Sequence, residues 1–206
     1  MKGKNNSHEF NTGDFSVLLG GHDLSKKYWQ EEERISGCAK VINVHPDWNV
    51  YVEDYWDADI AILELANEVQ FSKYIRPICI ADSRSEIAKA PNGTVVGFGK
   101  TESGRISDIA NKLEIPIYDY LNCTKHSERH RNLMSARTFC GGTADGHGVC
   151  LGDSGGGVYV KNKGRRYLRG LVSASLFDDV GCDVYEKAIF TDVTKYYDGI
   201  KRGKWD

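Results

Sequence analysis

The sequence between residues 150 and 157 reads Cys-Leu-Gly-Asp-Ser-Gly-Gly-Gly. Glycines on both sides of Ser154 allow the backbone to turn sharply and to approach a ligand closely. Consecutive backbone N–H groups in such a turn can converge on an anion. An exposed hydroxyl beside converging N–H donors supplies the nucleophile and the anion-stabilising site that acyl transfer requires. This stretch therefore makes Ser154 a candidate nucleophile.

Two other interpretations fit the same letters. Residues 152–156 match Gly-x-Ser-x-Gly, the nucleophile elbow of α/β-hydrolases, which needs a strand before the serine, a helix after it and a later histidine. Here Cys150 precedes the serine, the strand-like Val158-Tyr159-Val160 follows it, and the last histidine is His147. These flanks favour a loop followed by a strand. The other alternative is a glycine-rich turn with a solvated serine.

Short β-branched and aromatic runs, separated by Gly, Asn and Asp, dominate the rest of the chain and predict strands. The predicted strands are Phe15–Leu19, Ala39–Val44, Ile60–Glu64, Thr94–Val96, Lys112–Ile117, Val158–Val160, Leu168–Ser173 and Ala188–Phe190. One helical face over Val193–Ile200 predicts a closing helix, and the polar stretch Tyr120–Asn132 predicts a short helix or a loop. The pattern indicates an all-β sandwich or barrel with one C-terminal helix.

Composition restricts the classes of partner. The chain has 206 residues, of which 40% are hydrophobic, enough for one globular domain or a tight pair of small ones. A net charge of −2 provides no overall basic field for nucleic acid and no polybasic membrane patch. No apolar run approaches the roughly 20 residues of a membrane span. We therefore expect no nucleic-acid partner and no membrane partner.

Six cysteines that are not spaced as in a zinc module indicate an oxidising, extracellular setting. Three Asn-x-Ser/Thr sequons, at Asn5, Asn92 and Asn122, agree with a secreted protein. The first residues, Met-Lys-Gly-Lys-Asn-Asn, have no apolar stretch behind them and do not form a signal peptide. We expect a secreted chain whose true N-terminus lies upstream of Met1.

Several segments resemble the chymotrypsin/trypsin family of serine endopeptidases. Residues 152–156, Gly-Asp-Ser-Gly-Gly, are similar to its nucleophile signature. Residues 57–63, Asp-Ala-Asp-Ile-Ala-Ile-Leu, resemble its catalytic-aspartate segment, with Asp59 in the place of the aspartate. The remaining likenesses are a surface loop at 45–49, the link between two barrels at 75–80, and cleft-lining segments at 139–142 and 171–173. The likeness runs from about Phe15 to Ile200.

This resemblance implies two antiparallel Greek-key β-barrels, the first incomplete, and a C-terminal helix. A partial N-terminal barrel would occupy residues 1–75, and the C-terminal barrel with its closing helix residues 76–206. Ser154 would be the nucleophile, and the N–H groups of Gly152 and Ser154 would form the oxyanion hole. Asp59 would orient the catalytic histidine. If the Ser154 motif were not in the sequence, Asp59 would be interpreted as a capping surface aspartate ahead of a strand.

The resemblance also assigns Asp153 and the cysteines. Asp153 would pair with a new N-terminal amine after cleavage of a propeptide. Cys79 stands where multidomain members bond to an upstream propeptide or regulatory chain. Cys38 has no counterpart, so a bond to an absent segment and a Cys38–Cys79 bond both remain open. The implied disulfides within the chain are Cys123–Cys140 and Cys150–Cys182.

The family comparison extends to the substrate pocket. Trypsin-like enzymes carry an aspartate six residues before the serine, where this chain has Gly148. Ser173, Ser175 and Ala188 fall at the other pocket positions. We expect a preference for small or medium uncharged side chains at the cleavage position, which the nearby Asp183 can modify.

The catalytic histidine of the family has no match in this sequence. His8 lies 12 residues before Gly20, close to the family spacing, but its polar flanks differ from the Ala-Ala-His-Cys-like context. We expect the histidine upstream of Met1, with His8 as the alternative general base. His22 and His45 fit a solvated turn and a surface loop. His126, His130 and His147 follow Asp59, out of family order, and are predicted to be exposed loop residues.

These observations favour a secreted, chymotrypsin-like serine endopeptidase acting on proteins or peptides, without metal or cofactor. The chain resembles multidomain proteases of arthropod body-fluid cascades at three positions, which are Cys79, Gly148 and Gly157. Without its histidine, this chain alone is expected to show no proteolysis and to fold poorly. The alternative function is a non-catalytic protease homologue that acts as a binding or regulatory module.

Overall fold

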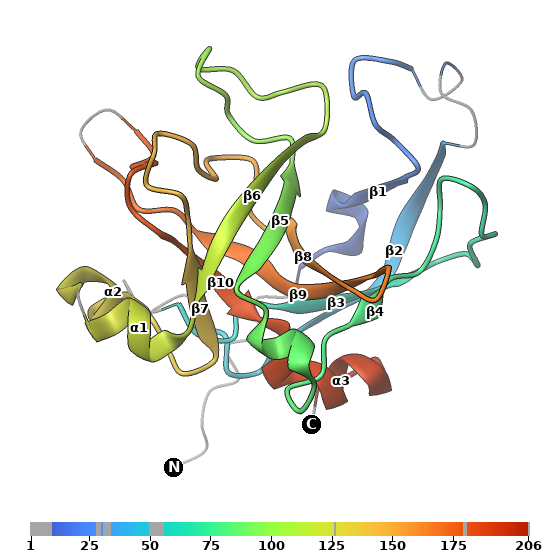
Figure 1. Cartoon of the computed structure of the whole chain (residues 1–206). Coiled ribbons are helices and arrows are strands. Elements are labelled where there is room, and N and C mark those ends of the chain that lie inside the picture. The colour runs from blue at the N-terminus through green and yellow to red at the C-terminus, as the bar shows by residue number, and fades with distance from the viewer. Residues whose placement is uncertain are drawn as a thin grey trace.

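The computed structural model describes residues 10–27, 30, 34–49, 56–125, 127–178 and 181–205. Strands dominate and form two sheets. Figure 1 shows the smaller sheet beside the larger one, with α3 (Tyr197–Arg202) below them. Within these residues, no helix is both long and apolar enough to cross a membrane.

The larger sheet has seven strands. They are β4 (Cys79–Ile80), β5 (Asn92–Gly97), β6 (Asn111–Tyr118), β7 (Thr138–Gly141), β8 (Gly157–Asn162), β9 (Arg165–Ala174) and β10 (Ala188–Asp192). Their order is β10-β7-β6-β5-β8-β9-β4, and β10 also pairs with β9. Six strands thus close into an antiparallel barrel, while β4 lies outside the ring and runs parallel to β9.

The smaller sheet stays open. It consists of β1 (Ser16–Leu19), β2 (Ile35–Val44) and β3 (Ala61–Leu65), and a short 3₁₀ helix, η1 (Thr12–Asp14), precedes it. Leu18, Ile35 and Leu63 each stay more than a third exposed. The predicted all-β fold, with one complete barrel and one incomplete one, is confirmed.

The barrel core is built from alternating strand positions. Phe139 on β7 and Phe190 on β10 are each 1% exposed and stack with ring centroids 5.2 Å apart. Val158 and Val172 pack into the same cluster. Burial of each such side chain contributes roughly 1.5–3 kcal/mol. This core holds β8 and β9, the strands that follow Ser154 and approach Asp59.

The helices differ in detail from the predicted ones. Tyr120–Asn132 forms two short helices, α1 (Tyr120–Lys125) and α2 (Glu128–Leu133), and η3 (Glu86–Lys89) precedes β5. The closing helix begins as a 3₁₀ turn, η4 (Val193–Tyr196), which Asp192 caps by accepting a hydrogen bond from the Thr194 N–H. The helix then continues as α3.

One histidine prediction is wrong. His130 is not an exposed loop residue, because it lies on α2 and is 2% exposed. Its ring bonds the Ser127 hydroxyl at 2.8 Å and the Lys187 carbonyl at 2.8 Å. A buried imidazole needs both partners. The Ser127 bond lies at the start of α2, whereas the Lys187 bond fastens α2 to the segment before β10.

Candidate active site

The Ser154 turn is exposed at the end of a loop that leads into β8. Gly155 N–H donates to the Val172 carbonyl at 2.8 Å, and Val172 N–H donates to the Gly156 carbonyl at 2.8 Å. Gly152 has a φ of +94°, and a Cβ there would lie 2.8 Å from Ile106 Cδ1. Only glycine adopts this conformation readily in such a narrow space.

The amides of Gly152 and Ser154 donate no hydrogen bond to any described part of the protein. Both residues are exposed. These two donors, on either side of Asp153 and next to the Ser154 hydroxyl, are therefore accessible to a ligand from solvent. Such donors can stabilise an oxyanion.

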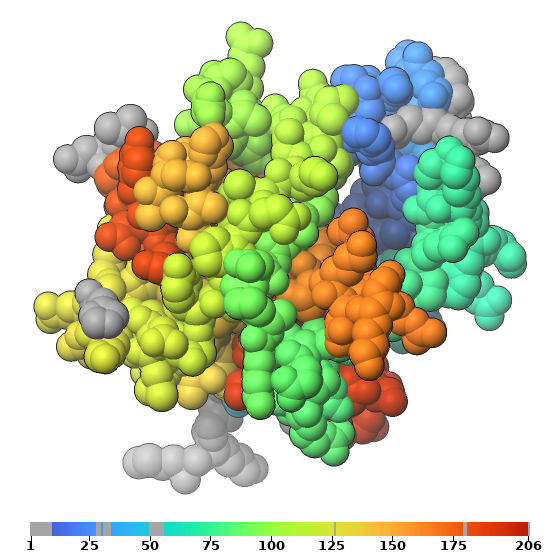
Figure 2. All heavy atoms as spheres, in the orientation of Figure 1, coloured from blue at the N-terminus to red at the C-terminus, as the bar shows by residue number. Residues whose placement is uncertain are grey.

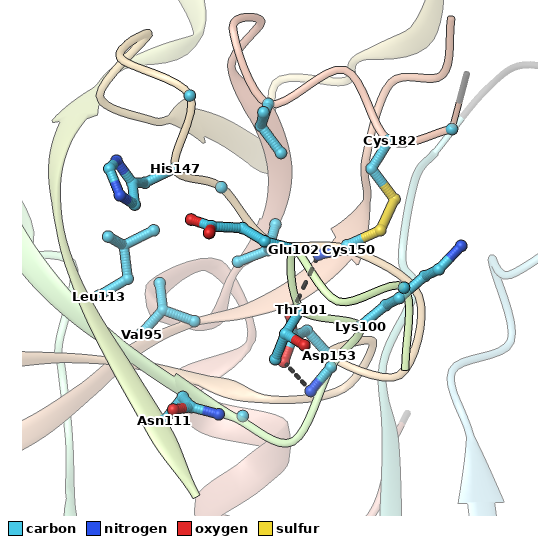
Figure 3. A pocket seen from close by; sticks show the side chains of 18 of the residues that line it. Val95, Lys100, Thr101, Glu102, Asn111, Leu113, His147, Cys150, Asp153 and Cys182 are labelled. Atoms are coloured by element: carbon cyan, nitrogen blue, oxygen red, sulfur yellow. Dashed lines mark hydrogen bonds between the residues drawn. A yellow bond between two sulfur atoms is a disulfide. The ribbon is translucent and has the colours of Figure 1, made fainter. Parts of the chain in front are cut away.

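Asp153 anchors this turn from behind. Its carboxylate accepts hydrogen bonds from Gly99 N–H at 2.8 Å and from Cys150 N–H at 3.1 Å, as the dashed lines in Figure 3 show. A Cβ at Gly97 or Gly99 would lie 1.9 or 2.1 Å from a carboxylate oxygen. Sequence reasoning missed this cradle, although the Gly97-Phe98-Gly99 repeat could have indicated a close approach.

A cavity of about 950 Å³ opens beside Asp153 (Figure 3). Lys100, Glu102 and His147 are among the residues that line it. His147 is exposed, as predicted, and contacts Asp145. The part-buried carboxylate of Asp153 therefore lines a cavity whose walls carry both positively and negatively charged side chains.

Asp59 is positioned by the strand that also holds the Ser154 turn. Ser173 Oγ on β9 donates to Asp59 Oδ2 at 2.7 Å, and Thr191 Oγ1 on β10 donates to the Asp59 carbonyl at 2.9 Å. Ser173 directly follows Val172, which bonds the residues next to Ser154. Asp59 and Ser154 thus converge on one short stretch of β9.

The segment before Asp59 is rigidly held. Ala58 is fully buried with a φ of +54°, an uncommon conformation for a residue with a side chain. Asp57 accepts hydrogen bonds from Ser135 Oγ at 2.6 Å and from Arg137 Nε at 3.0 Å. These bonds tie the end of the smaller sheet to the barrel and orient the Asp59 carboxylate.

Burial raises the pKa of Asp59 above its ordinary value of 3.8, and the Ser173 hydrogen bond offsets this only in part. The folded protein therefore holds the proton up to a higher pH than the unfolded chain. Stability falls as pH rises from the unfolded pKa through the folded pKa, and the loss persists at neutral pH.

We expect Asp59→Asn to raise the unfolding midpoint near pH 7 by about 2–4 °C, because it removes the cost of a buried charge. The gain should vanish below about pH 3, where both states of the wild type are protonated. Thermal melts across this range provide the measurement. Asp82→Asn is the control of opposite sign, since Arg84 lowers the pKa of Asp82. A wild type more stable than Asp59→Asn at neutral pH would contradict the prediction.

No histidine in the described ranges is brought to Asp59 by a contact. His45 lies in the predicted loop, but its side chain is only 14% exposed and packs against Trp205 and Tyr196 at ring-centroid distances of 4.8 and 5.1 Å. Burial lowers the pKa of His45. His22 is exposed, as predicted, whereas His8 and His126 lie outside the described residues.

Three of the four predicted pocket residues share one cavity. Gly148, Ser175 and Ala188 line a space of about 10 Å³, whereas Ser173 bonds Asp59 instead of lining this space. Val184, which sequence reasoning missed, fills the floor, because a Cβ at Gly148 would meet its side chain at 3.1 Å. Ser175 Oγ donates to the Val149 carbonyl at 2.9 Å, which narrows the wall.

The disulfides agree with the implied pairing. Cys123 bonds Cys140, and Cys150 bonds Cys182. The second bond ties the Ser154 loop to the segment that contains Val184. Cys38 and Cys79 are both free and exposed, so they are not bonded to each other. Within the described chain, no group of three or more His, Cys, Asp or Glu side chains is arranged to hold a metal ion.

Comparisons with known proteins agree with this geometry. The sequence model of the Trypsin family matches residues 5–200. The chain is 30% identical to Serine protease gd of Drosophila melanogaster, over 93% of this chain and 42% of that protein. It is 33% identical to Phenoloxidase-activating factor 1 of Holotrichia diomphalia, over 76% of this chain and 42% of that protein.

A third relative is CLIP domain-containing serine protease B4 of Anopheles gambiae, with 30% identity over 90% of this chain and 53% of that protein. The chain thus spans about half the length of the curated relatives it matches. The family match covers nearly the whole chain, and the closed barrel presents the signature turn at its surface. This chain belongs to the trypsin family of serine proteases.

Proposed function

We propose that this chain is the catalytic part of a secreted serine endopeptidase that acts in an extracellular protease cascade. The observation that carries the proposal is the geometry of the Ser154 turn. The open amides of Gly152 and Ser154 lie on either side of Asp153. The turn also forms hydrogen bonds with β9, the strand whose Ser173 holds the Asp59 carboxylate. Ser154 is the nucleophile, the amides of Gly152 and Ser154 form the oxyanion hole, and Asp59 orients a histidine.

The remaining parts follow from the same assignment. Residues 1–75 form the incomplete first barrel, and residues 76–206 form the second. Asp153 receives an amine generated by cleavage of a propeptide, and the cavity beside it gives that amine access. Exposed Cys79 on β4 bonds an upstream chain. Relatives that are named as a phenoloxidase-activating factor and as a CLIP domain-containing serine protease support this setting.

The narrow pocket defines the substrate class. Val184 on the floor and the Ser175–Val149 hydrogen bond leave space for a small, uncharged side chain. Gly148 takes the place of the aspartate with which trypsin-like enzymes bind Arg or Lys, although Asp183 also lines this space. The preferred substrates are therefore proteins with a small residue before the scissile bond.

The second candidate function is a non-catalytic binding module on a protease scaffold. The observation that favours it is that no described histidine contacts Asp59. The two functions differ in one property, the reactivity of Ser154 once an imidazole is available.

The test is covalent labelling of the 206-residue protein by a fluorophosphonate, with and without added imidazole. We expect imidazole to raise the labelling rate at least about tenfold, a fraction of the 10²–10⁴-fold that a positioned general base supplies. Ser154→Ala should abolish labelling, and Asp59→Asn should abolish the imidazole effect. Phosphonate probes with an alanine-like group should react faster than probes with a lysine-like group.

Each outcome separates the two functions. If labelling is fast without imidazole and His8→Ala abolishes it, this result would also support the protease function and would identify His8 as the general base. No labelling at any imidazole concentration, in a protein whose cooperative melt shows that it is folded, would overturn the protease assignment in favour of the binding module. Faster reaction with the lysine-like probe would overturn the pocket assignment.

A further inference from the structure

The turn between β8 and β9 concentrates positive charge. Lys161, Lys163, Arg165 and Arg166 occupy four of six consecutive positions, in a chain whose net charge is −2. All four are exposed. We call these residues the basic hairpin. Figure 2 shows this turn, in orange, at the surface and next to the blue-green segment that precedes β4.

The strand register brings like charges together. Lys161 lies directly opposite Arg166, and Asn162 lies opposite Arg165. Like charges opposite each other on antiparallel strands destabilise the pairing. None of the four hairpin cations has a carboxylate partner among the ion pairs of the described chain. Within the described residues, no ion pair therefore offsets this repulsion.

The tip of the hairpin is also unfavourable for folding. Lys163 has a φ of +47° and Gly164 a φ of +79°, so both central residues of the two-residue turn are left-handed. Such turns favour Asn-Gly, and a lysine at the first position carries a conformational cost. Departures from local folding rules that have no structural compensation tend to occur at functional positions.

A fifth cation, Arg76, lies three residues before β4 in the sequence. β4 runs parallel to β9, with Cys79 opposite Tyr167 and Ile80 opposite Leu168. Arg76 Nε bonds the Ser72 carbonyl at 3.0 Å, which fixes its position without neutralising its charge.

From these observations we propose that the basic hairpin is a docking surface for a linear sulfated polysaccharide. None of the four hairpin residues lines the cavity beside Asp153 or the cavity beside His45, so the cations lie on the open surface. A flexible chain with closely spaced sulfates can lie across it and contact cations on both strands. Disulfides in the chain indicate an oxidising, extracellular compartment, where such polymers occur and nucleic acids are not the usual partner.

The test is binding of the full 206-residue protein to fluorescent heparin, measured by anisotropy at about 0.15 M salt. Replacement of Lys161, Lys163, Arg165 and Arg166 by serine should weaken binding by at least about tenfold. The matched control changes the net charge equally by serine substitutions elsewhere, at Arg105, Lys125, Lys195 and Lys201. This control variant should lose less than about threefold in heparin affinity.

A second variant separates binding from folding. Lys163→Asn creates the favoured Asn-Gly turn, so it should keep or raise the unfolding midpoint while it weakens heparin binding by about twofold or more. Equal losses in the two quadruple variants would overturn the proposal, because they would indicate net charge alone. Polyglutamate that binds as tightly as heparin would also overturn it and would identify an acidic polypeptide as the partner. Neither result depends on whether Ser154 is reactive.

Discussion

Arg169→Leu is expected to lower the free energy of unfolding by about 3–5 kcal/mol, because it leaves a buried carboxylate without its counter-charge. Arg169 and Asp192 are 5% and 6% exposed and form an ion pair through Arg169 Nη1 and Asp192 Oδ1. Arg169 Nε also donates to the Ala88 carbonyl at 3.2 Å, and its guanidinium lies 4.7 Å from the centre of the Phe139 ring.

The loss should extend to the closing helix. Asp192 Oδ1 accepts hydrogen bonds from Thr194 N–H at 3.0 Å and Thr194 Oγ1 at 2.6 Å, which cap η4. Without this counter-charge, Asp192 turns towards solvent, and the cap of η4 weakens. Chemical denaturation of wild type and variant measures the difference.

The matched control is an ion pair at the surface. Lys40 and Glu64 lie 2.8 Å apart with side chains that are 61% and 54% exposed. Lys40→Leu should lower the free energy of unfolding far less than Arg169→Leu, because solvent screens this exposed pair. Equal losses of stability in the two variants would show that Asp192 is not held by Arg169 and that the cap of η4 does not depend on this ion pair.

The strands around the site were predictable because their patterns are local. The predicted Lys112–Ile117 and Ala188–Phe190 fall within β6 and β10, and the turn at Ser154 follows from its glycines. Both short strands that were missed, β4 and β7, depend on partners elsewhere. β7 is buried at all four of its positions, between β6 and β10, so it shows no alternation of polar and apolar residues.

The site itself depends on contacts that no local pattern contains. Ser173 and Asp59 are 114 residues apart in the sequence, yet their hydrogen bond fixes the carboxylate. His130 looked exposed because its neighbours are polar, but Lys187 on a distant segment buries it. Similarly, the contact between Val184 and Gly148 joins two segments that are distant in the sequence and that the Cys150–Cys182 bond links.

Gly99→Ala is expected to lower the imidazole-dependent labelling rate of Ser154 at least about 100-fold. A Cβ at this position would lie 2.1 Å from Asp153 Oδ2 and 2.2 Å from Asp153 Cγ, so the carboxylate has to move. Its hydrogen bonds to Gly99 N–H and Cys150 N–H then lengthen or break. The amides of Gly152 and Ser154 flank Asp153, and loss of one oxyanion donor alone costs about 10²–10³-fold in rate.

Two companion variants determine whether the effect is local. Gly37→Ala adds the same methyl group on β2, where nothing lies within 4 Å, and should leave the labelling rate and the unfolding midpoint nearly unchanged. Asp153→Asn keeps the size of the side chain but removes its charge and one acceptor, so it should lose labelling without steric strain. If Gly99→Ala does not fold, the labelling rate of Asp153→Asn alone tests whether the Asp153 hydrogen bonds keep the oxyanion donors in place. Labelling at the wild-type rate in Asp153→Asn would show that the oxyanion donors stay in place without the cradle, and the chemistry of Ser154 would then depend on the glycine turn alone.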